Sequence, residues 1–131
     1  MIFVDSNIPM YLVGAEHPNK PRTLALLERC VGDGERLVTD VEVFQEILHR
    51  YVAIARREAI SPAFEVLLAV IDEVFDVTLK DALRAKEIVL HLTGLSARDA
   101  LHLAVMEGHG VHRILSFDGG FDQIPGIDRL D

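Results

Sequence analysis

Tryptophan is absent from the 131-residue sequence, and cysteine occurs once, at Cys30. A single cysteine excludes a disulfide within the chain and is typical of a reducing compartment, so we expect a cytoplasmic protein. Aromatic residues make up only 6% of the sequence, so a core must consist mainly of leucine, valine, isoleucine and alanine. The histidines and the cysteine do not show the spacing of a zinc site.

Long apolar runs and an excess of positive charge are also missing. No apolar run approaches the roughly 18 residues of a transmembrane helix, and no signal peptide is recognisable, so we expect no membrane association. The sequence contains 13 Lys and Arg residues and 21 Asp and Glu residues, which gives a net charge of −8. This balance argues against tight nucleic-acid binding through a broad basic face, but it is compatible with an enzyme that reaches phosphodiesters through bound metal ions.

An apolar, β-prone run is present at the N-terminus, where Ile2, Phe3 and Val4 are followed directly by Asp5. A strand that is apolar at every position is typical of a parallel α/β sheet covered on both faces. Such sheets bind ligands just beyond the carboxyl ends of their strands. Asp5 is therefore predicted to lie where an α/β protein places its chemistry.

Strand-like and helix-like segments alternate along the rest of the chain, without a linker, repeat or low-complexity tract. This alternation predicts parallel βα units in one domain that spans residues 1–131. Ser6 or Asn7 is predicted to cap a short first helix, and Thr78 and Ser96 each begin a capping-box pattern. Further strands are predicted at 36–39, 75–79, 113–117 and 127–130, and longer helices at 23–31, 41–58, 62–73, 79–92 and 97–107.

Four acidic residues fall at comparable places relative to these elements. Asp5 and Asp118 each follow a strand, Glu46 lies early in the helix after the second strand, and Asp99 lies in the first turn of a helix. Clustered carboxylates repel one another, and divalent cations reverse that cost. Mg²⁺ prefers carboxylate and water oxygens, and one or two such ions can activate a water and neutralise a phosphate.

Glu46 also has an ordinary interpretation. It lies opposite the apolar face of its predicted helix, so a solvated surface position is expected, with an i,i+4 ion pair to Arg50. Glu42 competes with Glu46 for the same role, although a capping box with Thr39 accounts for Glu42 without chemistry. The predicted apolar face consists of Phe44, Ile47, Leu48, Tyr51, Val52 and Ala55.

The other three carboxylates and a nearby histidine are open to structural interpretations as well. Asp5 and Asp118 could each end a strand in a turn, and Asp99 could be the acidic member of the Ser96 capping box. At a helix N-terminus, the dipole would lower the pKa of Asp99 and keep it ionised. His102 follows Asp99 by three residues and could lie near the site, but a packed or hydrogen-bonded histidine is the favoured interpretation.

The order of these motifs resembles the PIN-domain family, and most of all the VapC-type ribonuclease toxins of prokaryotic toxin–antitoxin pairs. The resemblance covers essentially the whole chain. Its most specific parts are the opening motif and the Asp-Ala-Leu-His stretch. The residues that carry it are 3–7, 46–48, 98–104, 115–118 and 121–122.

This resemblance implies a three-layer α/β/α sandwich with a parallel central sheet of four or five strands. It implies Mg²⁺ or Mn²⁺ held by Asp5, Asp99 and Asp118, with Glu46 assisting directly or through water. Supporting polar positions, which orient the carboxylates, are matched by Asn7 and Ser116.

The reaction implied by the family is hydrolysis of an RNA phosphodiester by a metal-activated water, which leaves a 5′-phosphate and a 3′-hydroxyl. A cognate antitoxin that covers the cleft and a homodimer are implied as well. One position departs from the family pattern, because Gly120 stands where many relatives carry a further acidic residue. Asp122 is the candidate substitute for that lost ligand.

Two alternatives stay open at this point. The Gly120 departure and the negative charge favour a PIN-like module that binds RNA or a protein without efficient catalysis. A receiver-like phosphoacceptor domain also clusters aspartates at strand ends, but it needs a lysine after a late strand, and no lysine follows Lys86. Candidate RNA-guiding residues are Lys20, Arg22, Arg50, Arg56, Arg57 and Arg98.

Overall fold

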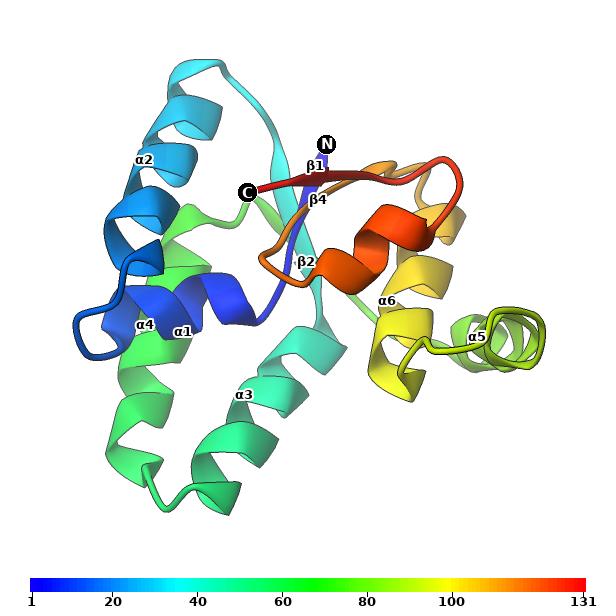
Figure 1. The fold of residues 1–131 in the computed structure, drawn as a ribbon, viewed down its shortest axis with the longest axis horizontal. Coiled ribbons are helices and arrows are strands. Elements are labelled where there is room, and N and C mark those ends of the chain that lie inside the picture. Colours follow the sequence, from blue (N-terminus) through cyan, green and yellow to red (C-terminus); the bar gives the residue numbers. More distant parts are fainter.

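A five-stranded sheet forms the centre of the computed structural model, which describes residues 1–131 (Figure 1). Its strand order is β3-β2-β1-β4-β5, and every neighbouring pair is parallel. This arrangement confirms the predicted parallel sheet. The strands are β1 (Ile2–Val4), β2 (Leu37–Asp40), β3 (Glu73–Phe75), β4 (Arg113–Leu115) and β5 (Asp128–Leu130).

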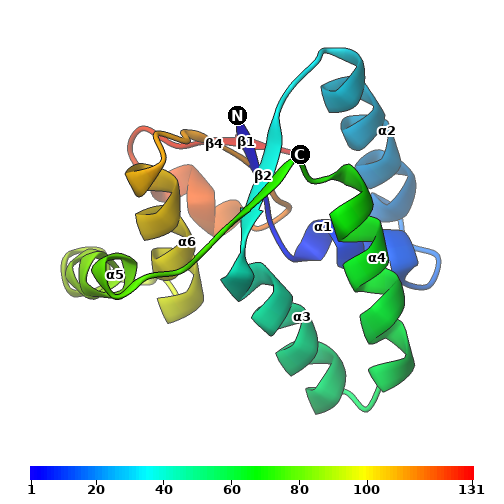
Figure 2. The ribbon, with the colours of Figure 1, turned by 180° about the vertical axis from the view of Figure 1, so that it is seen from behind.

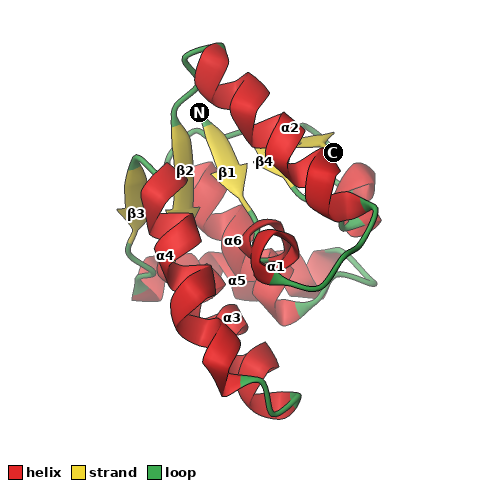
Figure 3. Cartoon of the chain, turned by 90° about the vertical axis from the view of Figure 1, so that its left-hand side faces the viewer, coloured by secondary structure: helices red, strands yellow, loops and turns green.

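Helices cover both faces of this sheet, which confirms the predicted three-layer α/β/α sandwich. Helices α1 (Asn7–Val13), α2 (Asn19–Gly32) and α4 (Ile60–Val70) lie on one face, and α5 (Leu79–His91) and α6 (Ala97–Gly108) on the other (Figures 1 and 3). Helix α3 (Val41–Ala53) runs away from the sheet beyond the end of β2 (Figure 2). Short 3₁₀ turns, η1 (Arg57–Ala59) and η2 (Gly119–Gln123), precede α4 and follow β4. None of the helices is both long enough and apolar enough to cross a bilayer.

The apolar sequence of β1 matches its position at the centre of the sheet. Ile2, Phe3 and Val4 are at most 1% exposed, because helices cover both faces of β1 and leave no solvent-facing position. They belong to a cluster of 26 buried apolar residues, mostly aliphatic, as the low aromatic content predicts.

The strand order changes direction beside β1, which makes this strand a topological switch point. The chain continues from β1 to β2 and β3 on one side of the sheet, and then crosses to β4 and β5 on the other. Val4 pairs with Leu115, and the backbone N–H of Asp5 donates to the Leu115 carbonyl at 3.1 Å. Ligands of open α/β sheets bind at such a switch point, outside the carboxyl ends of the strands. Asp5 and the segment after β4 both lie there.

Helix α3 differs from its prediction at both ends. It ends at Ala53 instead of residue 58, because Ala55 takes the left-handed conformation with φ of 57°. Asp40 is its N-cap and accepts the Val43 N–H at 3.0 Å, so the predicted capping box with Thr39 is wrong. The Thr39 hydroxyl instead donates to the Val4 carbonyl at 2.8 Å and ties β2 to β1.

The buried face of α3 is also rotated from the predicted one. Val43, Ile47 and Tyr51 are buried, whereas Leu48 and Val52 are 41% and 44% exposed. The sequence pattern placed both exposed residues in the apolar face, because they are apolar and lie at helical spacing. This rotation turns the Glu46 side of the helix inward.

Other boundaries differ less. The third strand ends at Phe75 instead of 79, since Thr78 already caps α5 through the predicted reciprocal box with Asp81. The Ser96 hydroxyl accepts the Asp99 N–H at 3.1 Å, which confirms the predicted start of α6. Helix α4 begins at Ile60 instead of residue 62 and ends at Val70 instead of residue 73.

Candidate active site

Asp5 is the innermost carboxylate of the candidate site and is only 4% exposed. Its Oδ1 accepts the Ser6 backbone N–H at 2.8 Å, and its Oδ2 accepts the Ser116 hydroxyl at 2.6 Å. Burial raises the pKa of Asp5, although His102 and these hydrogen bonds oppose the rise. The structure thus fixes this carboxylate in one orientation at the end of β1.

Asn7 and Ser116 connect the beginning of α1 to the end of β4. The Asn7 amide donates to the Ser116 Oγ at 3.2 Å, and its Oδ1 accepts the Phe117 N–H at 3.3 Å. Ser116 Oγ also accepts the Asp118 N–H at 3.0 Å. Both residues contact Asp5, with the Asn7 amide 3.4 Å from Oδ2, as the supporting role predicted for them requires.

Glu46 points into the site instead of toward bulk solvent. Its side chain is 13% exposed, its Oε2 accepts the Ser6 hydroxyl at 2.7 Å, and its Oε1 is hydrogen-bonded to His102 Nε2. Burial raises its pKa, but the hydrogen bonds from His102 and Ser6 outweigh burial, so the pKa lies below its ordinary value. The predicted surface position and ion pair with Arg50 are therefore wrong.

His102 is fully buried, which confirms that it is packed and hydrogen-bonded. Its Nδ1 lies 2.8 Å from Asp40 Oδ2, and its Nε2 faces Glu46. Burial lowers its pKa, but the two carboxylates outweigh this and hold the pKa well above its ordinary value. Ligand atoms of Asp5, Glu46 and His102 lie within 4.8 Å of one another. Because both ring nitrogens already face carboxylates, His102 has none free for a metal.

Asp99 and Asp118 lie outside this compact group, but Asp99 is close enough to other carboxylates to respond to their charge. Burial, followed by the charges of Asp5 and Asp118, raises the pKa of Asp99 to about 6. The predicted lowering of this pKa by the helix N-terminus is therefore wrong, because desolvation and two neighbouring carboxylates outweigh the dipole. Asp118 is exposed and accepts the Gly120 N–H at 2.9 Å, which begins the turn η2.

Asp122 has a cationic partner of its own, Arg129. Its two carboxylate oxygens lie 2.8 and 2.9 Å from the guanidinium of Arg129. A ligand role for Asp122 stays a prediction and would require this bidentate pair to open. A Cβ at Gly120 would lie 3.1 Å from Asp118 Oδ1, so the glycine leaves room for Asp118 to close its turn.

The donor atoms of this site suit a hard divalent cation. Asp5, Glu46, Asp99 and Asp118 supply carboxylate oxygens, and the one nearby imidazole is occupied on both sides. Mg²⁺ and Mn²⁺ prefer such oxygen donors, whereas zinc sites use histidine and cysteine. A cation would also relieve the repulsion that raises the pKa of Asp99.

Asp40 and Ser6 are site residues that the sequence analysis missed. A usable signal was present for Asp40, because it ends a strand just as Asp5 and Asp118 follow theirs. Ser6 was considered only as a helix cap. It lies at the N-cap position of α1 but makes no capping bond through its side chain, because its hydroxyl is directed to Glu46.

Comparison with known sequences gives one consistent group. A family model described as "PIN domain" matches residues 2–127. The chain is 59% identical over 130 residues to the VapC ribonuclease Mb1869c of Mycobacterium bovis and to ribonuclease VapC13 of Mycobacterium tuberculosis, with 99% of each chain covered. Ribonuclease VapC23 of Mycobacterium tuberculosis is 39% identical over 118 residues, with 90% of this chain and 93% of the relative covered.

Solved structures show the same fold. Mycobacterium tuberculosis VapC20, described as a sarcin–ricin loop cleaving toxin, superposes with a TM-score of 0.76 at 24% identity and covers 93% of both chains. A DNA-bound VapBC from Salmonella typhimurium gives a TM-score of 0.72 at 17% identity, with 100% of this chain and 98% of the other covered.

Proposed function

Because the chain belongs to the PIN-domain family and, within it, to the VapC group, we propose that it is a divalent-metal-dependent endoribonuclease and the toxin of a toxin–antitoxin pair. The relatives named as ribonucleases support the activity, and VapC20 supports the toxin role. The proposal is supported most directly by Asp5 and Glu46, whose carboxylate oxygens lie within 4.8 Å of each other, and by Asp99, whose pKa is raised to about 6 by burial and then by the charges of Asp5 and Asp118.

The residues divide into ligands and supports. A Mg²⁺ or Mn²⁺ ion held by Asp5, Asp99 and Asp118, with Glu46 assisting, would neutralise the scissile phosphate and lower the pKa of a water. Ser116 and Asn7 fix the orientation of Asp5. The exposed Asp118 and the partly buried Asp99 form the side of the site that a polymer can reach from solvent.

The proposal predicts cleavage that depends on a divalent metal. Purified protein is expected to cut RNA from a mixed pool in Mn²⁺, to lose activity in excess EDTA and to regain it when Mn²⁺ is restored. Products are expected to carry 5′-phosphates, which a phosphate-dependent exonuclease detects. Cleavage that persists undiminished in EDTA would contradict the metal-dependent mechanism.

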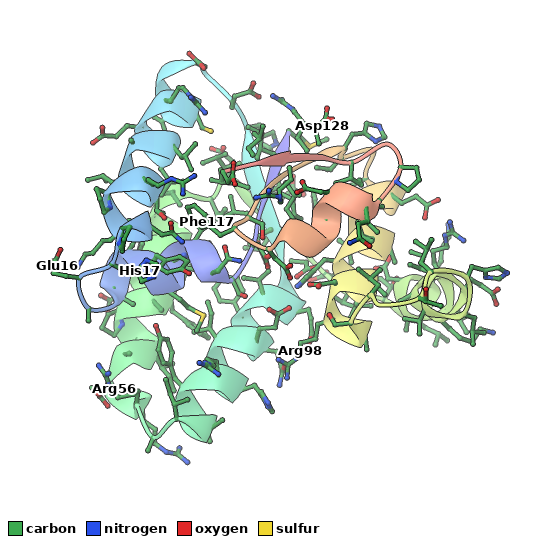
Figure 4. All side chains as sticks on the ribbon, viewed as in Figure 1. Glu16, His17, Arg56, Arg98, Phe117 and Asp128 are labelled. Atoms are coloured by element: carbon green, nitrogen blue, oxygen red, sulfur yellow. The ribbon has the colours of Figure 1, made fainter.

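Two cations flank the site and are proposed to guide RNA to it. The guanidinium of Arg22 lies 5.3 Å from the centroid of the Phe117 ring. Phe117 stands between Ser116 and Asp118 in the sequence. Arg98, adjacent to Asp99, reaches Glu42 at 4.0 Å between α6 and α3 (Figure 4). Arg56 lies at the far end of α3 and pairs with Glu58.

We predict that Arg22→Ala raises KM for RNA about three- to tenfold, leaves kcat nearly unchanged and reduces the salt slope of log KM by about one, because one phosphate contact is lost. Arg56→Ala is the matched control and is expected to change neither quantity. Equal effects of the two substitutions would show that charge acts only through the net field of the protein.

The remaining partners are proposals of the same kind. Several structural neighbours are toxin–antitoxin complexes, which supports a cognate antitoxin for this chain. An apolar groove of about 910 Å³ between α1, α2 and α4 offers surface for such a protein. The homodimer and the cytoplasmic location stay predictions, the second supported by a single buried free cysteine.

The two alternative functions are not favoured. The strand order 3-2-1-4-5 differs from the 2-1-3-4-5 order of receiver domains, so the receiver-like interpretation is wrong. The ribonuclease names of the whole-chain relatives favour an enzyme over a binding module.

A further inference from the structure

His102 and Asp40 form a buried pair that neither the predicted ligand set nor the proposed mechanism uses. Both side chains are 0% exposed, and they lie on different elements, α6 and the end of β2. The imidazole stands between two carboxylates, with Nδ1 2.8 Å from Asp40 and Nε2 on Glu46. Phe3 packs against the ring with centroids 5.3 Å apart and an interplanar angle of 49°, which limits how the ring can turn.

Asp40 is itself immobilised by the backbone. One of its oxygens caps α3 by accepting the Val43 N–H at 3.0 Å, and the other faces His102. The cap requires only the first oxygen. The second is therefore free to hold the ring so that Nε2 is directed at Glu46.

The contacts continue from Glu46 to the central aspartate. The second oxygen of Glu46 accepts the Ser6 hydroxyl at 2.7 Å, and the Ser6 N–H donates to Asp5 at 2.8 Å. Both oxygens of Glu46 are thus hydrogen-bonded, one to the buried His102 and the other to Ser6 at the start of α1. No buried side-chain polar atom lacks a partner, so this network is fully satisfied.

We propose that His102, oriented by Asp40, is a positioning residue that fixes the Glu46 carboxylate at the carboxyl edge of the sheet for a divalent cation. The inference rests on the proposed function of the site. It assigns His102 a role outside metal coordination, because neither ring nitrogen is free. Partners that orient ligating carboxylates typically change metal affinity or activity by about 10–100-fold when they are lost.

Two substitutions at position 102 separate positioning from simple filling of space. In H102Q the side-chain amide reaches approximately as far as Nε2 and can still donate to Glu46. In H102N the shorter amide reaches only as far as Nδ1 and can contact Asp40 but not Glu46. Both place a polar amide in the same buried space, so a purely structural role predicts similar losses of thermal stability and no difference in metal binding.

The readout is the Mn²⁺ dissociation constant by titration calorimetry, together with the melting temperature and with kcat and KM for RNA. H102N is expected to weaken Mn²⁺ binding about 10–100-fold and to lower kcat with little change in KM, and H102Q is expected to recover most of both losses. Asp40→Asn keeps an oxygen for the α3 cap and provides a second test if H102N does not fold. We expect it to weaken Mn²⁺ binding in the same direction.

Measurements on the wild type distinguish failure of the proposed function from failure of the positioning role alone. Wild-type protein that neither binds Mn²⁺ nor cleaves RNA overturns the proposed function, and the positioning role with it. Wild-type protein that does both, alongside H102N and D40N variants with unchanged Mn²⁺ affinity, overturns the positioning role alone. Equal weakening in H102Q and H102N also overturns it, because contact with Glu46 would then not matter.

Discussion

Asp5→Asn is expected to lower kcat for RNA cleavage by about 1,000-fold or more, since loss of a metal-binding carboxylate removes several kcal/mol of transition-state stabilisation. The fold is expected to survive. Asparagine retains an oxygen for the Ser6 N–H, and its neutral amide avoids the desolvation that burial imposes on the ionised Asp5 carboxylate. The melting temperature should therefore change by only a few degrees, and the loss should appear in activity.

Asp128→Asn is the matched control for this substitution. Asp128 begins β5, so it lies at the edge of the parallel sheet opposite Asp5, and it is exposed (Figure 4). Its variant is expected to cleave RNA at the wild-type rate. Asp122→Asn tests the open question about the last ligand, and the ion pair with Arg129 leads us to expect at most a severalfold loss. Full activity of a folded Asp5→Asn protein would contradict the proposed site.

Asp99→Asn is expected to inactivate the protein and, without metal, to stabilise it. The pKa of Asp99 is raised from 3.8 to about 6, first by burial and then by Asp5 and Asp118. The folded protein therefore binds this proton more tightly than the unfolded chain, and ionisation favours unfolding. A shift of about two units corresponds to about 3 kcal/mol before screening, and solvent screening of this partly exposed carboxylate reduces the expected effect above pH 6 to about 1–2 kcal/mol.

The sign of this effect gives it a distinct pH profile. The stability difference between Asp99→Asn and wild type should be near zero below pH 4, grow as the pH rises to about 6 and then stay constant. Thermal unfolding in EDTA at pH 4, 5, 6 and 7 measures it. Added Mn²⁺ should stabilise the wild type at pH 7 much more than the variant, because a ligand that binds only the folded state raises its stability. A variant less stable than wild type at pH 7 in EDTA would contradict the predicted repulsion.

The sequence was sufficient for the parts of the fold that depend on local pattern. A strand apolar at every position predicted β1 as a buried strand, and Ser96 and Thr78 predicted the starts of α6 and α5. The convergence of Asp5 and Asp118 followed from a general property of parallel sheets, in which neighbouring strands present their carboxyl ends at one edge.

The errors arose where tertiary contacts override helical periodicity. Glu46 was predicted to be solvated because the pattern assigned residues such as Leu48 and Val52 to the buried face, yet α3 extends beyond the sheet and exposes them. His102 and Asp40 are 62 positions apart in sequence, so no local pattern could predict their contact. Side-chain networks of this kind require the relative placement of three elements, which spacing along the chain does not provide.

The most direct test of the account is a calorimetric titration of Mn²⁺ into the wild type, Asp5→Asn and Asp128→Asn at pH 7. If the carboxylates at the ends of β1 and β4 hold the catalytic ion, the wild type and Asp128→Asn will bind Mn²⁺ with the same affinity and Asp5→Asn will bind it at least about tenfold more weakly. Equal affinity in all three proteins would place the metal elsewhere and contradict the central claim.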